Sequence, residues 1–536
     1  MKLNKKSYFL PLILFVAVLF GLLLGNLLAR KALFSSWDNV FQLGKSSKVD
    51  ELINIINANY VDTLNMHELT ESVMQDVVSK LDPHSVYIPA EDLSDVNSEL
   101  EGSFSGIGVQ FNIQNDTVMI ISVISGGPSE KAGLMAGDRI IEVNDTSFVG
   151  KNITNERVMK KLRGPEGTKV KLGIRRHGTR EILHYEITRG KVPVNSVDIA
   201  YMIQPGVGFI KVSKFAETTY DEFLNALAGL KNQGAKKFII DLRGNSGGFM
   251  DQAINMVNEF LPANRLIVYA EGKAYKRFEA TSDGKGSCIR EPLAVLIDEF
   301  SASASEIFSG AIQDNDRGVI VGRRSFGKGL VQQQFSLSDG SAVRLTVARY
   351  FTPSGRCIQK PYELGKADEY EKDFINRLMH GDADNKDSIQ YADSLKYKTV
   401  GGRIVYGGGG IMPDFFVPLD TTEYTPYLNK VINYGYIYQY AFQYSDKNRQ
   451  QLKQIKNWTE MDHYLDKQPL LNEFVKFAAQ KGVPANTREI NISKNLILTQ
   501  IKSYISRNIL GDEGFYPLFY KNDQTIKKAL EVLSKK

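Results

Sequence analysis

The chain has 536 residues, of which 66 are basic and 61 acidic, so its net charge is +5. A charge this small over such a length excludes proteins that hold nucleic acid on a concentrated basic face, and we expect no nucleic-acid partner. The composition, 43% hydrophobic and 24% charged, is typical of a folded globular protein. Because domains usually hold about 100 to 150 residues, the length predicts three or four of them.

The first apolar segment covers residues 8–29 and is interrupted only by Asn26. As a helix rising about 1.5 Å per residue, it is long enough to cross a hydrocarbon core of about 30 Å. Three lysines precede it, and a cleaved signal peptide usually has a shorter apolar stretch. Residues 1–31 are therefore predicted to be an uncleaved transmembrane anchor in the cell membrane, with the rest of the chain on the exported, periplasmic or extracytoplasmic, side. Secretion after signal cleavage is the alternative.

The chain has only two cysteines, Cys288 and Cys357. Two are too few for a disulfide scaffold or a structural zinc site. They can form one disulfide in an exported protein or remain two separate thiols, and the sequence leaves both alternatives open. We expect no metal and no cofactor.

Residues 48–100 carry apolar side chains at helical spacing and predict two short helices before the break at Asp82-Pro83. Residues 101–190 change to short alternating or β-branched runs punctuated by glycines, which predicts a β-rich domain. Residues 154–162 are the best helix candidate in that domain.

Residues 191–418 alternate apolar strands with helical segments, which predicts an α/β core made of a mixed sheet with flanking helices. The expected strands are 207–212, 237–242, 265–270, 293–297 and 318–321, and the expected helices begin near residues 219, 252 and 303. Strands 330–337 and 341–351 form a predicted hairpin. Residues 363–398 are charge-rich and expected as a surface insertion. Residues 419–536 are expected as a helical carboxyl-terminal region of unknown role.

A candidate nucleophile, Ser303, lies where the apolar strand 293–297 gives way to an amphipathic helix. Such a corner exposes a hydroxyl and places it near the partial positive charge of a helix amino terminus. The alternative is that the serines here only cap the helix, with Glu306 three residues after Ser303 completing a capping box.

A serine nucleophile needs a base, and residues 195–353 contain no histidine. A Ser-His-Asp triad within this segment is therefore excluded, and a desolvated lysine remains. Lys328 is the best candidate because glycines on both sides let its backbone approach the helix corner closely. The same loop fits most of a phosphate-binding motif, but Gly329 stands where Ser or Thr should hold magnesium, and a strand-like segment follows.

The glycine-rich loop 241–248 follows an apolar strand and precedes a helix. Its backbone N–H groups could form half of an oxyanion hole. The alternative is a tight turn in which Asp241 and Arg243 form a structural pair.

These segments together resemble the C-terminal processing peptidases, also called tail-specific proteases. The resemblance rests on Ser-Ala-Ser-Ala-Ser-Glu at 301–306, Phe-Gly-Lys-Gly at 326–329 and Asp-Leu-Arg-Gly-Asn-Ser-Gly-Gly at 241–248. It implies that Ser303 is the nucleophile, Lys328 the base and Gln332 the residue that orients the lysine. The backbone amides implied for the oxyanion hole are those of Ala304 and of Gly247 or Gly248.

The family resemblance also implies that the β-rich unit is an inserted PDZ domain. Its loop for a substrate's terminal carboxylate would be formed by Gly106, Ile107, Gly108 and Val109. We therefore expect an exported serine endopeptidase that cleaves protein substrates with free carboxyl-terminal tails through an acyl-enzyme. A homo-oligomer is left open, and the alternative function is that of a non-catalytic PDZ scaffold with the peptidase fold.

Overall fold

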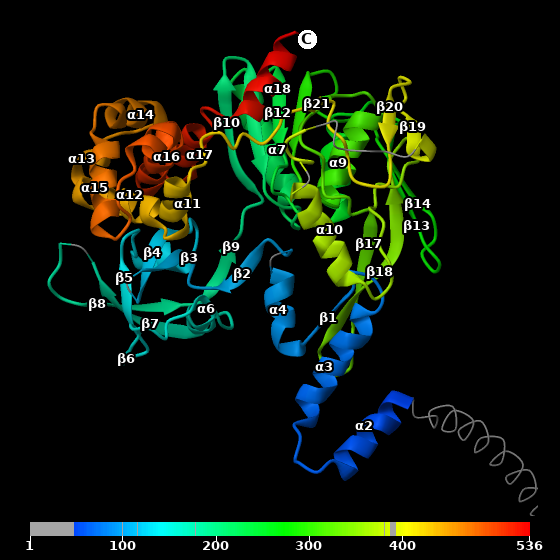
Figure 1. Cartoon of the computed structure of the whole chain (residues 1–536), viewed down its shortest axis with the longest axis horizontal. Coiled ribbons are helices and arrows are strands. Elements are labelled where there is room, and N and C mark those ends of the chain that lie inside the picture. Colours follow the sequence, from blue (N-terminus) through cyan, green and yellow to red (C-terminus); the bar gives the residue numbers. More distant parts are fainter. Residues whose placement is uncertain are drawn as a thin grey trace, which may run out of the picture. The chain divides into compact units, whose positions relative to one another are not determined.

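The computed structural model describes residues 48–98, 100–114, 116–176, 178–379, 381–385 and 393–535 (Figure 1). The predicted anchor, residues 1–31, lies outside the described residues. Within them, no helix combines the length and the apolar character needed to cross a membrane. The chain divides into two compact units between Val77 and Val78. The first unit contains the two predicted short helices, α2 (Lys48–Asn59) and most of α3 (Met66–Ser79).

The second unit is built around a six-stranded mixed sheet with the order β10-β11-β12-β15-β16-β21. The neighbours from β11 to β21 are parallel, and β10 is antiparallel to β11. Four of these strands lie where the sequence predicts them, whereas β10 and β21 are additional. The strands are β10 (Val197–Gln204), β11 (Val207–Val212), β12 (Lys237–Asp241), β15 (Leu293–Ile297), β16 (Val319–Gly322) and β21 (Phe415–Phe416).

Helices cover both faces of this sheet. Adjacent residues of a strand point to opposite faces, so two neighbours of β12 show what covers each face. Ile240 of β12 packs in a core with α7 (Thr219–Asn232), α8 (Met250–Asn258) and α9 (Ala304–Asp314). Its neighbour Ile239 packs in a second core with Tyr516 and the helix α18. The helices of this second face are α17 (Asp512–Phe519) and α18 (Gln524–Ser534), which Figure 1 draws in red at the end of the chain.

A second sheet contains the predicted hairpin, and its order is β1-β18-β13-β14 with β17 paired to β18. The segment that became β13 was expected in the central sheet, and this expectation is wrong. Between β12 and β15 the chain leaves the parallel ladder, because β13 pairs antiparallel with both β14 and β18. The strands are β1 (Val86–Ile88), β13 (Leu266–Glu271), β14 (Phe278–Thr281), β17 (Leu330–Ser336) and β18 (Ala342–Phe351).

The β-rich domain has its own sheet, with the order β3-β4-β5-β7-β8 and β6 paired to β5. Its two ends meet where β2 (Ser103–Gly106) pairs with β9 (Gly190–Pro193). The predicted helix is α6 (Asn155–Leu162), whose N-cap Thr154 accepts from Arg157 N–H. The remaining elements are β3 (Val109–Gln114), β4 (Thr117–Val123), α5 (Pro128–Ala132), β5 (Arg139–Val143), β6 (Thr146–Ser147), β7 (Lys169–Arg175) and β8 (Leu183–Thr188).

The charged insertion contributes helix α10 (Ala367–Met379), a 3₁₀ turn at Asp393–Leu395 and the pair β19 (Lys396–Lys398) and β20 (Ile404–Tyr406). Arg377 of α10 donates to the carbonyl of Phe326 at 3.0 Å. The insertion therefore contacts the loop that leads to Lys328.

Six further helices form a separate apolar core in the carboxyl-terminal region. They are α11 (Pro426–Asn433), α12 (Tyr436–Lys447), α13 (Arg449–Leu452), α14 (Trp458–Asp466), α15 (Leu470–Gln480) and α16 (Thr487–Leu510). The predicted helical character of residues 419–536 is thus confirmed. One further helix, α4 (Ala90–Ser98), lies before the β-rich domain.

The two cysteines are separate thiols, since neither Cys288 nor Cys357 is in a disulfide. Burial raises the pKa of both thiols. A raised pKa keeps a thiol protonated and less reactive. Cys288 is buried, whereas Cys357 is half-buried.

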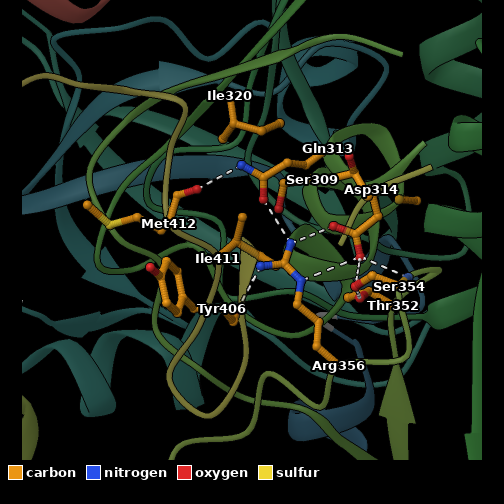
Figure 2. Close-up of polar contacts among 12 residues, drawn as sticks. Ser309, Gln313, Asp314, Ile320, Thr352, Ser354, Arg356, Tyr406, Ile411 and Met412 are labelled. Carbon is orange, nitrogen blue, oxygen red and sulfur yellow. Dashed lines mark hydrogen bonds and ion pairs between the residues drawn. The ribbon is translucent and has the colours of Figure 1, made fainter. Parts of the chain in front are cut away.

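A buried arginine ties the end of α9 to the loops around it (Figure 2). The Arg356 guanidinium, fully buried, pairs with the fully buried Asp314 at 2.7 Å and also donates to Gln313 Oε1 and the carbonyl of Tyr406. Ser354 Oγ donates to the same carboxylate at 2.7 Å. Since α9 begins next to Ser303, this cluster fixes the far end of the helix that carries the candidate nucleophile.

Replacing Arg356 by methionine should lower the free energy of unfolding by about 3 to 5 kcal/mol, because it leaves Asp314 as an unpaired buried charge. Urea unfolding followed by circular dichroism measures this change. The double variant Arg356→Met/Asp314→Leu should recover most of the loss, because no charge then stays buried.

The matched control for this prediction is Arg277→Met, in an ion pair at the surface. Arg277 is 51% exposed and pairs with Glu279 at 2.7 Å. An exposed pair contributes about 0 to 1 kcal/mol, so this variant should unfold almost like the wild type. Equal losses in the Arg277 and Arg356 variants would contradict the role assigned to the buried pair.

Candidate active site

Three loops meet at one edge of the central sheet because they follow neighbouring parallel strands. Strand β12 ends at Asp241, which is in register with Leu296 near the end of β15. Ile297, the last residue of β15, is in register with Gly322, the last of β16. Ligand and active sites in parallel sheets form at this carboxyl edge, where the loops are free to carry function.

Ser303 lies at the corner between β15 and α9, as the sequence predicts. It is the N-cap of α9 and has φ 54° and ψ −113°, a region that residues other than glycine rarely occupy. Such strain persists only where the surroundings fix it, and it is concentrated at functional sites. The fixing contacts include Ser301 Oγ, which donates to the carbonyl of Leu242 at 2.8 Å.

Lys328 follows β16 and is half-buried. Its Nζ donates to Gln332 Oε1 at 2.9 Å, and Gln332 Nε2 in turn donates to the carbonyl of His84. Burial lowers the pKa of Lys328, and the positive charge of Arg344 lowers it further. The group that orients the amine, Gln332, is a neutral carboxamide. It does not favour the charged form of Lys328, whereas a carboxylate would.

A buried carboxylate, Glu306, joins the serine corner to the lysine loop. Its Oε2 accepts from the N–H groups of Ser303 at 2.9 Å and Lys328 at 2.8 Å. Its Oε1 accepts from Ser325 Oγ at 2.5 Å and from Gly327 N–H at 2.8 Å. Burial raises the pKa of Glu306 to about 7, while the four donors oppose that rise. The sequence identified Glu306 only as part of a helix cap, because its second set of partners is 19 or more residues away in the chain.

The loop after β12 lies against the serine corner. A Cβ on Gly247 would lie 2.8 Å from Ser303 Cβ and 3.1 Å from Ala304 N, so only glycine fits there. The Gly247 N–H donates to Asn245 Oδ1, and Ala302 N–H donates to the Asn245 carbonyl. The two loops are thereby locked together at the point where the nucleophile emerges.

A cavity of about 580 Å³ opens at these loops. Its lining includes Ser303, Lys328 and Gln332 together with the loop glycines Gly247 and Gly248. Ala304 follows Ser303 as the first residue of α9. The structure thus brings together the residues that the sequence proposes for the chemistry.

Arg344 of β18 lies at the same cavity and was not identified from the sequence. Its Nη2 donates to Gln334 Oε1 at 3.0 Å. No sequence signal indicates this residue, because it reaches the site only through the pairing of β17 with β18.

A histidine does reach the neighbourhood of Lys328, but from outside the α/β segment. His84 Nε2 lies 3.0 Å from Tyr370 Oη, and its ring packs edge-on against Tyr370. Burial and the charge of Lys328 lower the pKa of His84 to about 4, so the ring is neutral near pH 7. The described contacts of the His84 ring are with Tyr370 and Phe326, and the backbone carbonyl of His84 accepts from Gln332 Nε2.

The predicted carboxylate loop lies in the β-rich domain and not at the cavity. Gly106 ends β2, Val109 begins β3, and Ile107 is buried between them. Gly108 has φ 78°, which suits glycine. Strand β3 is at the edge of its sheet, with β4 as its only strand partner among the described residues, and an edge strand is where an added peptide strand can pair.

Three family models match separate parts of the chain. That of peptidase family S41 matches residues 206–366, and that of the PDZ domain matches residues 94–175. A third, a family of unknown function called DUF8443, matches residues 427–511 of the helical region.

The chain is also similar to curated and solved proteins. Carboxy-terminal processing protease CtpA of Bacillus subtilis (strain 168) is 36% identical over 317 residues, 59% of this chain and 67% of the relative. A probable CtpA-like serine protease of Staphylococcus aureus (strain MRSA252) is 34% identical over 58% of this chain and 62% of the relative. The solved photosystem II D1 C-terminal processing protease is 28% identical, with a TM-score of 0.32 over 57% of this chain and 88% of that one.

The matched region spans about two thirds of the length of these curated relatives. The S41 match includes Ser303 and Lys328, and the PDZ match includes most of the β-rich domain. The chain therefore belongs to peptidase family S41, as a serine-type peptidase with a PDZ domain that is related to the carboxy-terminal processing proteases.

Proposed function

We propose that this peptidase binds the unstructured carboxyl-terminal tails of proteins at its PDZ domain and cleaves them with Ser303 as nucleophile and Lys328 as general base. The observation that carries the proposal is the shared cavity, which Ser303, Lys328 and Gln332 all line. The strained backbone of Ser303 is typical of functional sites, and burial lowers the pKa of Lys328, as a lysine base requires.

In the proposed mechanism, Ser303 Oγ attacks the peptide carbonyl while Lys328 Nζ takes the hydroxyl proton. The tetrahedral intermediate collapses, the C–N bond breaks, and Lys328 returns the proton to the leaving amine. Water then attacks the acyl-enzyme with Lys328 again acting as base, which releases the new carboxylate and restores Ser303. Gln332 holds the lysine in place without charging it, since its Oε1 is a neutral acceptor.

The proposed oxyanion hole consists of the backbone amides of Ala304 and Gly248. Ala304 is the first residue of α9, where the backbone N–H has no partner within the helix. Gly247 is the weaker candidate for the second donor, because its N–H already donates to Asn245 Oδ1. Backbone donors of this kind stabilise the negative charge that develops in the transition state.

The proposal places the catalytic part on the exported side of a membrane, with residues 1–31 as the anchor. The support is the apolar segment 8–29 and the lysines that precede it. The proposed ligands of the PDZ domain are free carboxylates of substrate tails, held at the loop from Gly106 to Val109 beside the edge strand β3.

A pair of tailed substrates tests this function. A folded reporter protein carrying an unstructured apolar tail should be cleaved within the tail, as mass spectrometry of the products measures. Amidating the terminal carboxylate should raise KM about 10- to 100-fold, since the loop then loses a charge-assisted hydrogen-bonded group. The Ser303→Ala variant should bind the tail and leave it intact.

Two results would contradict the proposal. Equal KM values for the free and amidated tails would remove the PDZ loop from substrate recognition. Binding of the tail without cleavage by the wild-type protein would favour the scaffold function instead.

A further inference from the structure

Helix α18 reaches the loop 241–248, which carries Gly248, one of the two proposed oxyanion donors. Helix α18 packs Ile526, Ala529 and Leu533 against the central sheet. Residues 512–536 lie outside the ranges that the three family models match. The contact is therefore a feature of this chain that its family assignment does not explain.

Asp523, the N-cap of α18, uses each carboxylate oxygen for a different purpose. Its Oδ1 accepts from Ile526 N–H at 2.9 Å, which caps the helix. Its Oδ2 accepts from Arg243 Nη1 at 2.7 Å. Arg243 belongs to the loop after β12, so the cap of the last helix and the active-site loop share one side chain.

Arg243 is held from several directions and is only 14% exposed. Its Nε and Nη2 donate to the two oxygens of the fully buried Asp241, at 3.0 and 2.8 Å. Its guanidinium lies 5.2 Å from the ring centre of Tyr520, which follows α17. Lys211 Nζ donates to the Arg243 carbonyl. Two cations and two carboxylates thus balance in this cluster, and Asp523 supplies one of the negative charges.

Hydrogen bonds connect the loop that contains Arg243 to the backbone around Ser303. Directly after Arg243, Gly244 N–H donates to Asp298 Oδ1 at 2.9 Å. The next residue, Asn245, accepts at its carbonyl from Ala302 N–H at 3.0 Å and from Ser305 Oγ at 2.8 Å. Ala302 and Ser305 flank Ser303, so the backbone that Arg243 anchors is bonded on both sides of the proposed nucleophile.

We propose that Asp523 is a positioning residue for catalysis, which acts through Arg243 to hold the loop 241–248 against the Ser303 corner. This inference rests on the proposed function of that site. It gives the last helix of the carboxyl-terminal region a specific role, to complete the support of the oxyanion loop.

The test begins with Asp523→Asn. Asparagine is as good an N-cap as aspartate, so the helix keeps its cap while Arg243 loses one of its two charged partners and keeps Asp241. We expect kcat to fall about 2- to 30-fold with KM unchanged. The double variant Arg243→Gln/Asp523→Asn should have the same kcat as Arg243→Gln alone, because Asp523 acts through Arg243.

The matched control is Lys237→Met, which weakens the docking of α18 without touching the loop. Lys237 Nζ donates to the carbonyl of Leu533 at the other end of the helix, at 2.5 Å. This variant should lower the melting temperature and leave kcat unchanged. If kcat falls in both variants in proportion to their loss of stability, or if Asp523→Asn has wild-type kcat, the positioning role is wrong.

Hydrogen exchange separates this inference from the proposed function. Exchange of the Gly244 and Gly247 amides should become faster in Asp523→Asn and not in Lys237→Met, whether or not the tested peptide is a substrate. If Ser303→Ala still cleaves the peptide, the proposed function fails, while the exchange result still decides whether Asp523 holds the loop 241–248 in place. Unchanged exchange in Asp523→Asn would overturn the inference.

Discussion

Lys328→Ala is expected to lower kcat by about 10²- to 10⁴-fold, the usual contribution of a general base, with little change in KM. Lys328→Arg should lose as much, because arginine keeps the positive charge but does not release its proton. A lysine with a structural role would tolerate this replacement better. Steady-state kinetics on a tailed peptide, with melting temperatures as a check on folding, measure the effect.

The assignment of Lys328 as the base also predicts how kcat/KM changes with pH. Burial and the charge of Arg344 lower the pKa of Lys328, so kcat/KM should rise with pH through an apparent pKa below the usual value of about 10.4. Removing that charge in Arg344→Met should raise the pKa of Lys328 and move the profile to higher pH. Most of the activity should then return at high pH.

His84 is the residue whose behaviour could contradict the assignment. Burial and the charge of Lys328 keep its ring neutral near pH 7, which is also the form that a base requires. Under the assignment to Lys328, His84→Ala should keep most of the activity, because only its backbone carbonyl contacts Gln332. A large loss of kcat in His84→Ala with full activity in Lys328→Ala would assign the base to histidine instead.

The sequence predicts the buried parts of the fold well, because a fully buried strand is an uninterrupted apolar run. The strand predicted at 293–297 is β15, and all five of its residues are buried. Strand β10 was missed because it is an outer strand of the sheet with mostly half-buried residues, so its apolar signal is weak. The contact of α18 with the sheet was also missed, since an amphipathic pattern does not identify what covers its apolar face.

In the candidate site too, some residues could be predicted from the sequence and others could not. Ser303 is recognisable because a strand-to-helix corner is a local feature, and Lys328 because no histidine is available in the segment. Asp523 and Arg344 depend on contacts between distant segments, such as the 280-residue separation between Arg243 and Asp523. No local pattern encodes such a contact.

Glu306→Gln should have the second large effect, a fall in kcat of about 100-fold, comparable with that of a misplacement of catalytic groups by about 1 Å. All four partners of the Glu306 carboxylate are donors, since Ser325 Oγ also accepts from Ile411 N–H and so gives its own hydrogen to Glu306. The amide group of glutamine would face two of these donors with its own N–H bonds. The backbones of Ser303 and Lys328 would then move apart.

The pH profile of Glu306→Gln distinguishes displacement from a change in the lysine. The negative charge of Glu306 raises the pKa of Lys328, so its removal should shift the rise of kcat/KM to lower pH while the plateau falls. More of Lys328 is then neutral and able to act as a base, so a lower kcat has to come from displacement of Ser303 or Lys328. The matched control is Glu299→Gln, which removes the partner of Arg323 at 2.7 Å and should keep kcat. A wild-type plateau in Glu306→Gln would show that the bridge between the two loops is dispensable.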